Sequence, residues 1–179
     1  MPSDIQVTNI KANDGTAGLV IADSTGAVTG TLGSGTTFPA GHVIQVVSTH
    51  LTTAPQYAIN STTWVAGGLY VTITPSSTSS KILVHAMCSL NFDDSSVNAV
   101  GYTSIHRGST LLTAVQSAIE QGITHHAGSS TLVYLDSPNT TSATTYQCYG
   151  KSSVASFDWR LNSNDTDTSS TITAMEISA

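Results

Sequence analysis

Basic residues are scarce in this chain. Lys and Arg number five among 179 residues, against eleven Asp and Glu, and the formal net charge is −6. A protein that binds a phosphate backbone usually presents a basic face made of clustered Lys and Arg. The scarcity of such residues therefore argues against nucleic acid as a partner.

Long apolar runs are also missing. No uninterrupted apolar stretch approaches the roughly 18 residues that a membrane-spanning helix needs. The N-terminal segment MPSDIQVTNIKAND has no basic region followed by an apolar one, as a signal peptide would. We therefore expect neither membrane insertion nor a cleaved export signal.

Cysteine is almost absent. Cys88 and Cys148 are the two in the chain, and neither belongs to a C-x-x-C motif. Two cysteines are too few for a disulfide-stapled scaffold, and this spacing is not that of a zinc or redox site. We expect both to be free thiols that pack as small buried hydrophobic groups.

The motifs of common enzyme classes are missing as well. The sequence contains no G-x-S-x-G, Walker A or G-x-G-x-x-G pattern. Glycoside cleavage needs a pair of carboxylates, and the candidates considered in the main domain outside the last loop are Asp93, Asp94, Glu120, Asp136 and Asp158. The chain is also short for the long β-helix of a polysaccharide-degrading tailspike. We predict that the protein is not an enzyme.

Metal and cofactor sites are not indicated by the polar clusters. His125 and His126 are adjacent, so in a strand they point to opposite faces. Residues 162–167, NSNDTD, offer oxygen ligands but lack the Gly and the distal Glu of an EF-hand loop. His85 and His106 lie in expected strands and either meet at a subunit interface or form local hydrogen bonds. We predict no bound metal and no cofactor.

Hydroxyl side chains are abundant, and apolar residues recur at every second position. Ser and Thr make up about 30% of the chain, and a period of two indicates β-strands. In KILVHAMCSLNF, residues 81–92, one face is apolar and should line a core, whereas the other is mixed and could contact another subunit. The first face comprises Ile82, Val84, Ala86, Cys88 and Leu90; the second comprises Lys81, Leu83, His85, Met87 and Ser89.

The same alternation predicts a chain that is nearly all β. Strands are expected at 42–51, 69–74, 81–92, 99–107, 131–136, 144–151, 154–161 and 171–177. Residues 110–123 fit a helix and one or two strands equally well. The connecting segments, HAGSS at 126–130 among them, are rich in turn-forming residues, and we interpret TPSSTSS as a solvent-facing hairpin turn. About eight short strands separated in this way predict a β-sandwich or jelly roll.

The first forty residues have a different composition. They contain glycine at 15, 18, 26, 30, 33 and 35, with short apolar pairs between them and too little bulk for a core of their own. We expect residues 1–40 to form an extended β arm with a joint to the main domain, and residues 41–179 to form the sandwich.

Several segments, in this order, resemble a known class of proteins. The arm pattern I-x-V-x-x-I…G-x-x-x-L-x-I…G-x-V precedes FPAGHVIQVV. The segments VTITPSSTSSKILV, IHRGSTLL, LDSPNTTSATTYQCYGKSS and STITAMEISA follow it. The series resembles the distal domains of structural proteins from tailed bacteriophages, particularly those of marine and cyanobacterial hosts. The arm positions that carry the pattern are Ile5, Val7, Ile10, Leu19, Ile21 and Val28.

The resemblance implies a homotrimer on the virion surface, assembled in the bacterial cytoplasm and attached through the arm. Its partners would be a tail or vertex adaptor or the major capsid protein, and a host-surface glycan or protein. The chain has almost no shaft, which favours a short fibre, or alternatively a capsid decoration protein, over a long fibre. A free carbohydrate-binding module is a further alternative.

Aromatic residues are the remaining candidates for contact with a host surface, because such contacts favour rings with polar neighbours. Trp64, Tyr102, Tyr149 and Trp159 are the surface-binding candidates. Trp64 is the best of them, since it follows AINSTT and precedes VAGG in what should be a loop.

Overall fold

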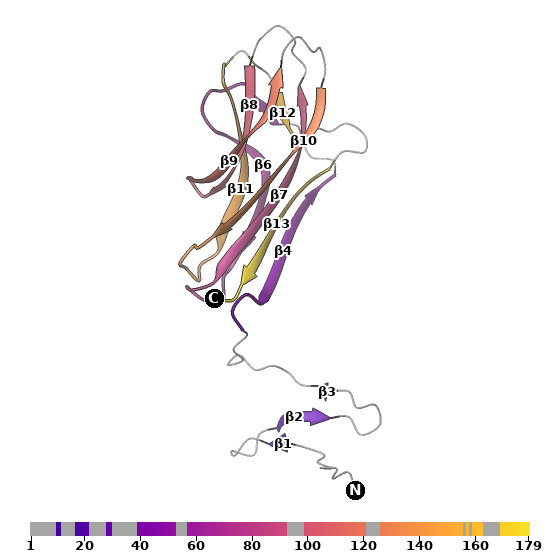
Figure 1. Ribbon diagram of the computed structural model, residues 1–179, viewed down its shortest axis with the longest axis vertical. Coiled ribbons are helices and arrows are strands. Elements are labelled where there is room, and N and C mark those ends of the chain that lie inside the picture. The colour runs from indigo at the N-terminus through magenta and orange to yellow at the C-terminus, as the bar shows by residue number, and fades with distance from the viewer. Residues whose placement is uncertain are drawn as a thin grey trace. The chain divides into compact units, whose positions relative to one another are not determined.

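The computed structural model contains two compact units, residues 1–37 and residues 38–179 (Figure 1). It describes residues 10–11, 17–21, 28–29, 39–52, 57–92, 99–120, 126–155, 157, 159–162 and 169–179. All the regular structure in these ranges is β-strand. None of the described residues forms a helix with the length and hydrophobicity that a membrane crossing requires.

The N-terminal unit contains a small antiparallel sheet. Its strands are β1 (Ile10–Lys11), β2 (Ala17–Ile21) and β3 (Val28–Thr29), with β2 in the middle. Four of the expected arm residues, Ile10, Leu19, Ile21 and Val28, lie in these strands, whereas Ile5 and Val7 lie outside the described residues. The role of these six residues in attachment stays a prediction.

The second unit is built from two antiparallel sheets. The larger sheet contains β4 (Val43–Leu51), β13 (Ser170–Ile177), β7 (Lys81–Phe92), β12 (Trp159–Leu161) and β5 (Tyr57–Ile59), with β10 (His126–Asp136) on the other side of β7. The smaller sheet contains β6 (Val65–Ile73), β11 (Thr144–Ser152), β8 (Ala99–Arg107) and β9 (Thr110–Glu120), in that order. The prediction of an all-β sandwich is confirmed.

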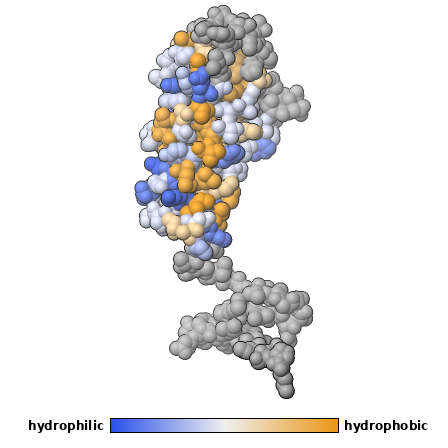
Figure 2. Space-filling model, viewed as in Figure 1, coloured by the Kyte–Doolittle hydropathy of each residue, from blue (hydrophilic) through white to orange (hydrophobic). Residues whose placement is uncertain are grey.

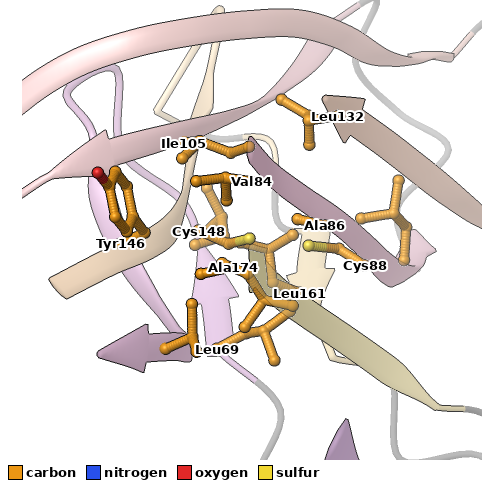
Figure 3. Packing of buried hydrophobic residues seen from close by; sticks show 14 of the residues in the cluster. Leu69, Val84, Ala86, Cys88, Ile105, Leu132, Tyr146, Cys148, Leu161 and Ala174 are labelled. Atoms are coloured by element: carbon orange, nitrogen blue, oxygen red, sulfur yellow. The ribbon is translucent and has the colours of Figure 1, made fainter. Parts of the chain in front are cut away.

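The core lies between the two sheets and follows the alternation of the sequence (Figure 3). In β7, every second residue from Ile82 to Leu90 is buried, as predicted for the inner face. Leu69, Tyr146 and Cys148 pack from the smaller sheet. Cys88 and Cys148 are both buried free thiols, and contact with Cys88 together with burial raises the pKa of the Cys148 thiol.

Several boundaries differ from those expected. Residues 110–120 form strand β9, which settles the choice between helix and strand. HAGSS, expected as a turn, is the first half of β10, because it pairs along the end of the long strand β7. Within the strand expected at 154–161, β12 is formed, and the described residues 154, 155 and 157 are not in a strand. The short strand β5 carried no detectable alternation in the sequence.

The TPSSTSS segment is not a hairpin turn, and this interpretation was wrong. It leaves β6 in the smaller sheet and enters β7 in the larger one, so it crosses between the sheets. The buried carboxylate of Glu176 holds the segment in place: it accepts hydrogen bonds from the Ser76 backbone N–H (2.8 Å), the Ser76 hydroxyl (2.6 Å) and the Ser80 hydroxyl (2.6 Å). Gln45 Nε2 donates a fourth at 2.5 Å.

Part of the large hydroxyl content lies inside the sandwich. Thr103 of β8 hydrogen-bonds to Ser117 of β9 and to Ser130 of β10, the latter at 2.6 Å. Ser117 and Ser130 are 3.2 Å apart. Because β8 and β9 belong to one sheet and β10 to the other, these three hydroxyl groups connect the two layers without any charge.

Candidate functional site

The outer face of the smaller sheet carries a group of aromatic rings around a lysine. Side chains of β8 and β11 that point away from the core are paired across the strands: Tyr102 lies opposite Lys151, and Ser104 lies opposite Tyr149. Trp64 joins them from the segment that leads into β6. We call Trp64, Tyr102, His106, Tyr149 and Lys151 the aromatic cluster.

The rings and the lysine of the aromatic cluster are in direct contact. The imidazole of His106 stacks on the Tyr149 ring, with centroids 4.1 Å apart and an interplanar angle of 23°. Trp64 meets His106 edge-on at 5.6 Å. The Lys151 ammonium lies 4.9 Å from the Trp64 ring centroid and 5.1 Å from that of Tyr102, within the range of cation–π attraction.

Two polar atoms in this region are buried without a hydrogen-bond partner. They are the Oγ of Ser104 and the Nε2 of His106, which stand two residues apart on the outward side of β8. Burial lowers the pKa of His106, so the imidazole is predominantly neutral at pH 7. An unsatisfied buried polar atom costs about 1–3 kcal/mol, so a group that hydrogen-bonds to these two atoms would offset that cost.

Three of the four predicted surface aromatic residues meet in this cluster, and the fourth does not. Trp64, Tyr102 and Tyr149 are all partly exposed. Trp159 is fully buried, so it is not a surface residue, and we correct that expectation. Its indole N–H donates to the Ser152 hydroxyl at 3.0 Å, and Gly101 leaves room for the ring, since a Cβ there would lie 3.0 Å from it.

The outer face of the larger sheet carries aliphatic residues instead. A row in register crosses four neighbouring strands, from Val46 through Met175 and Leu83 to Leu135. Val46 is 56% exposed and Leu135 is 49% exposed, while the two central residues are partly exposed. We call this row, together with the neighbouring residue Val133, the aliphatic face.

Apolar residues form a band along the side of the sandwich seen in Figure 2. Strands β7, β13 and β4 lie in front in the same view in Figure 1. Apart from Lys81, the outward positions of these strands carry aliphatic, thioether, hydroxyl, imidazole and amide side chains. An exposed apolar surface with so little charge around it is typical of a surface that contacts a partner.

Of the carboxylates and histidines considered for chemistry, the side chains of His85, His106 and Asp136 are described. Within the described ranges, no group of three or more His, Cys, Asp and Glu could hold a metal ion. Asp136 accepts hydrogen bonds from Arg107 (2.7 Å) and the Tyr146 hydroxyl (2.7 Å), so it is bonded structurally inside the sandwich. Asn162 donates to the Gly67 carbonyl. Residues 93, 94, 125, 158 and 163–168 lie outside the described residues, as do the side chains of Glu120 and His126.

Reasoning from the sequence missed two members of the aromatic cluster. Lys151 ends the run YQCYGK, two positions after Tyr149, so an alternating strand places both on one face. Tyr102 and His106 are four positions apart in the strand expected at 99–107, so alternation places these two side chains on one face as well. What the sequence does not give is that β8 and β11 are neighbours, and this pairing brings the four residues together.

Similarity to known proteins is limited to distant solved structures. No protein-family model matches the chain, and no curated protein does. The T13 viral particle of IBDV aligns with a TM-score of 0.43 and 13% identity, over 84% of this chain and 40% of that chain. The VP2 subviral particle of infectious bursal disease virus aligns with a TM-score of 0.37 and 15% identity, over 76% and 33%. The chain thus spans less than half of these proteins, and at such TM-scores the similarity carries no argument about function.

Proposed function

We propose that this protein is a non-enzymatic structural protein of a tailed-phage virion. In this proposal it forms a short trimeric fibre, anchored by residues 1–40, that exposes the sandwich to the host surface. The observation that carries the proposal is the aliphatic face, because a sandwich that worked as an isolated monomer would leave this surface in water. The resemblance of the sequence to distal domains of phage proteins supports the same function.

A second copy of the chain is the partner that best suits the aliphatic face. Four strands about 4.8 Å apart, with eight residues at about 3.3 Å each, give a flat area on the order of 400–500 Å². This area includes polar side chains as well as the aliphatic row, and apolar patches of a few hundred Å² on a protein surface are often functional. Hydroxyl groups such as those of Ser48 and Thr173 lie beside the row and bond to each other at 3.0 Å, and Lys81 is the one charged side chain at the outward positions of β4, β7 and β13.

The mass of the purified protein in solution tests the trimer. Light scattering after size exclusion should give about three times the chain mass of 18.5 kDa. Dilution should lower this mass only at concentrations below the dissociation constant. A single-chain mass at all concentrations would overturn the trimer, and with it the assignment of the aliphatic face to self-association.

Labelling of intact particles distinguishes the fibre from a capsid decoration protein. An antibody or gold label directed at the sandwich should mark a few sites at the tail or vertices if the protein is a fibre. A dense and regular signal over the head would instead assign it to decoration, with the arm lying across the major capsid protein. Either pattern is compatible with a trimer, so this experiment is independent of the mass measurement.

The arm is tested by deletion of residues 1–40. The deletion leaves the first contacts of the sandwich intact, since the Gly41 N–H donates to the Ser178 carbonyl at 2.8 Å and the Ser178 N–H donates to the His42 carbonyl at 2.8 Å. We expect a folded, soluble domain that no longer enters particles. A truncated chain that fails to fold would mean that the boundary lies earlier, and one that still enters particles would remove the arm from attachment.

A free carbohydrate-binding module is the second candidate, and the aromatic cluster is the observation that favours it. Sugar-binding surfaces combine aromatic rings with nearby polar groups, as this cluster does. A glycan array probed with the wild type and with Trp64→Ala tests it. Glycan binding by a monomeric protein would favour the carbohydrate-binding module over the trimeric fibre.

A further inference from the structure

The Lys151 ammonium stands out among the few cations of this acidic protein. Four Lys or Arg side chains are described, those of Lys81, Arg107, Lys151 and Arg160. Arg107 forms an ion pair with Asp136. Lys151 is held instead by the rings of Trp64 and Tyr102. Ring faces orient an ammonium group but do not neutralise it, so its charge remains available to an anion.

We propose that the aromatic cluster binds a sugar that bears a carboxylate, with the carboxylate on Lys151 Nζ and the sugar ring against Trp64 and Tyr102. This inference rests on the proposed host-contact function and names the chemistry of the ligand. A charge-assisted hydrogen bond from the ammonium fixes the acidic group. The apolar face of the sugar ring packs on the aromatic rings, which supplies the rest of the affinity.

The net negative charge of the protein opposes nonspecific binding of anions. The formal net charge of −6 repels anions in general, so an anion binds only where a local cation is fixed and uncompensated. Lys151 satisfies both conditions because its contacts are rings and not carboxylates. A neutral sugar would use the rings but would gain nothing from the ammonium.

The two unpartnered atoms next to the rings provide an independent indication of a ligand. Ser104 is completely buried and His106 is 95% buried, and neither the Ser104 hydroxyl nor the His106 Nε2 has a hydrogen-bond partner. Trp64 is partly exposed and lies edge-on to His106, and in this proposal its ring moves aside when the ligand binds. Sugar hydroxyl groups, which both donate and accept hydrogen bonds, would then satisfy them.

The position of the cluster in the fold agrees with an exposed ligand site. It lies on the outer face of the smaller sheet, while the aliphatic face lies on the outer face of the larger one. Association of subunits through the aliphatic face would therefore leave the aromatic cluster in solvent. The two functions would use opposite sides of one sandwich.

Titration of the full chain with acidic oligosaccharides tests the inference. The probes are a galacturonic acid oligomer, the same oligomer with its carboxyl groups reduced to neutral alcohols, and inorganic phosphate. Tryptophan fluorescence is a suitable readout, because Trp64 is partly exposed whereas Trp159 is buried. Calorimetry gives the affinity independently. We expect the acidic oligomer to bind at millimolar or lower concentration and the reduced oligomer about tenfold more weakly.

Matched variants separate the site from the general charge of the protein. Lys151→Gln should weaken binding of the acidic oligomer about tenfold, whereas Lys81→Gln removes the same charge from the other sheet and should leave binding unchanged. Trp64→Ala should abolish detectable binding, and Tyr70→Ala, which removes an exposed ring outside the cluster, should not. Circular dichroism confirms that each variant is folded.

Each outcome decides between the proposals. No binding of the acidic oligomer at millimolar concentration, or equal binding of the acidic and reduced oligomers, would overturn the acidic-sugar site. Equal loss in Lys151→Gln and Lys81→Gln would do the same, as would phosphate competing as well as the sugar. If the protein is a trimer and binds no sugar, the proposed structural function stands and the acidic-sugar site is overturned. If it is a monomer and binds the sugar, the site stands and the trimeric fibre is overturned.

Discussion

The two outer faces of the sandwich differ sharply, although both sheets share one core. The outer face of the larger sheet presents an aliphatic row across four strands, and that of the smaller sheet presents rings around a lysine. Inward positions of both sheets carry the same kinds of apolar residues. The comparison indicates that inward residues determine the fold, and that outward residues are free to determine which partner each face accepts.

The largest expected effect is on the stability of the fold, and it comes from a substitution in the core that both faces share. Trp159→Ala should destabilise the fold by about 3–5 kcal/mol, because it leaves a cavity beneath Phe92 and removes the hydrogen bond to Ser152. Trp64→Ala, on the outside, should lower the free energy of unfolding by only about 1 kcal/mol, because it removes one edge-on ring contact and one cation–π contact. Urea denaturation followed by circular dichroism measures both. Equal losses would mean that Trp64 belongs to the core and not to a surface site.

The next largest effect is on subunit association, and it comes from a substitution in the aliphatic face alone. Leu83→Asp places a carboxylate in the centre of the row, and should weaken subunit association by about 3 kcal/mol, or roughly a hundredfold. Tyr70→Asp introduces the same group on the opposite outer face, where Tyr70 is 53% exposed, and should leave the mass unchanged. Light scattering across a concentration series checks both variants. If Tyr70→Asp dissociates the trimer and Leu83→Asp does not, the subunits associate through the outer face of the smaller sheet and not through the aliphatic face.

A smaller effect on stability is expected at Glu176, which binds the TPSSTSS segment between the two sheets. Burial raises the pKa of Glu176, but hydrogen bonds from Ser76, Ser80 and Gln45 outweigh it and leave the pKa below its usual value. Glu176→Gln should cost about 2 kcal/mol at pH 7. A lowered pKa in the folded state means that the carboxylate stabilises the fold above its unfolded pKa of about 4.3, and that this stability is lost as the pH falls through the folded pKa.

The pH dependence gives the Glu176 prediction a second, sharper test. The difference in unfolding free energy between the wild type and Glu176→Gln should be constant near neutral pH and shrink steadily below about pH 4. Denaturant titrations at a series of pH values measure it. A difference that does not depend on pH would show that the substitution acts through packing and not through the charge.

Alternation within a strand was enough to predict much of the fold. It gave the inner face of β7 from Ile82 to Leu90 correctly, and with it the sandwich. It could not give the partners of each strand, because pairing depends on residues far apart in the chain. For the same reason TPSSTSS resembled a hairpin turn: its bond to Glu176 spans about a hundred residues, and no local pattern contains it.

The aromatic candidates show where such reasoning stops. Trp64, Tyr102 and Tyr149 were found by residue type alone, and so was Trp159, which is buried. Trp159 differs from the others because Gly101, on another strand, has no side chain and leaves space for the Trp159 ring. The local sequence around Trp159 does not reveal this contact. Lys151 was missed because a lone lysine in a strand is ordinary until Tyr102 is known to lie opposite it.

The hydroxyl groups of Thr103, Ser117 and Ser130 have a consequence for the conditions under which the fold persists. They join the two sheets through neutral hydrogen bonds, and neutral hydrogen bonds carry no net charge for dissolved ions to screen. None of the three groups titrates at ordinary pH. The contact between the layers should therefore be as strong in brine as in fresh water, which suits a protein that must keep its shape in whatever water surrounds the particle.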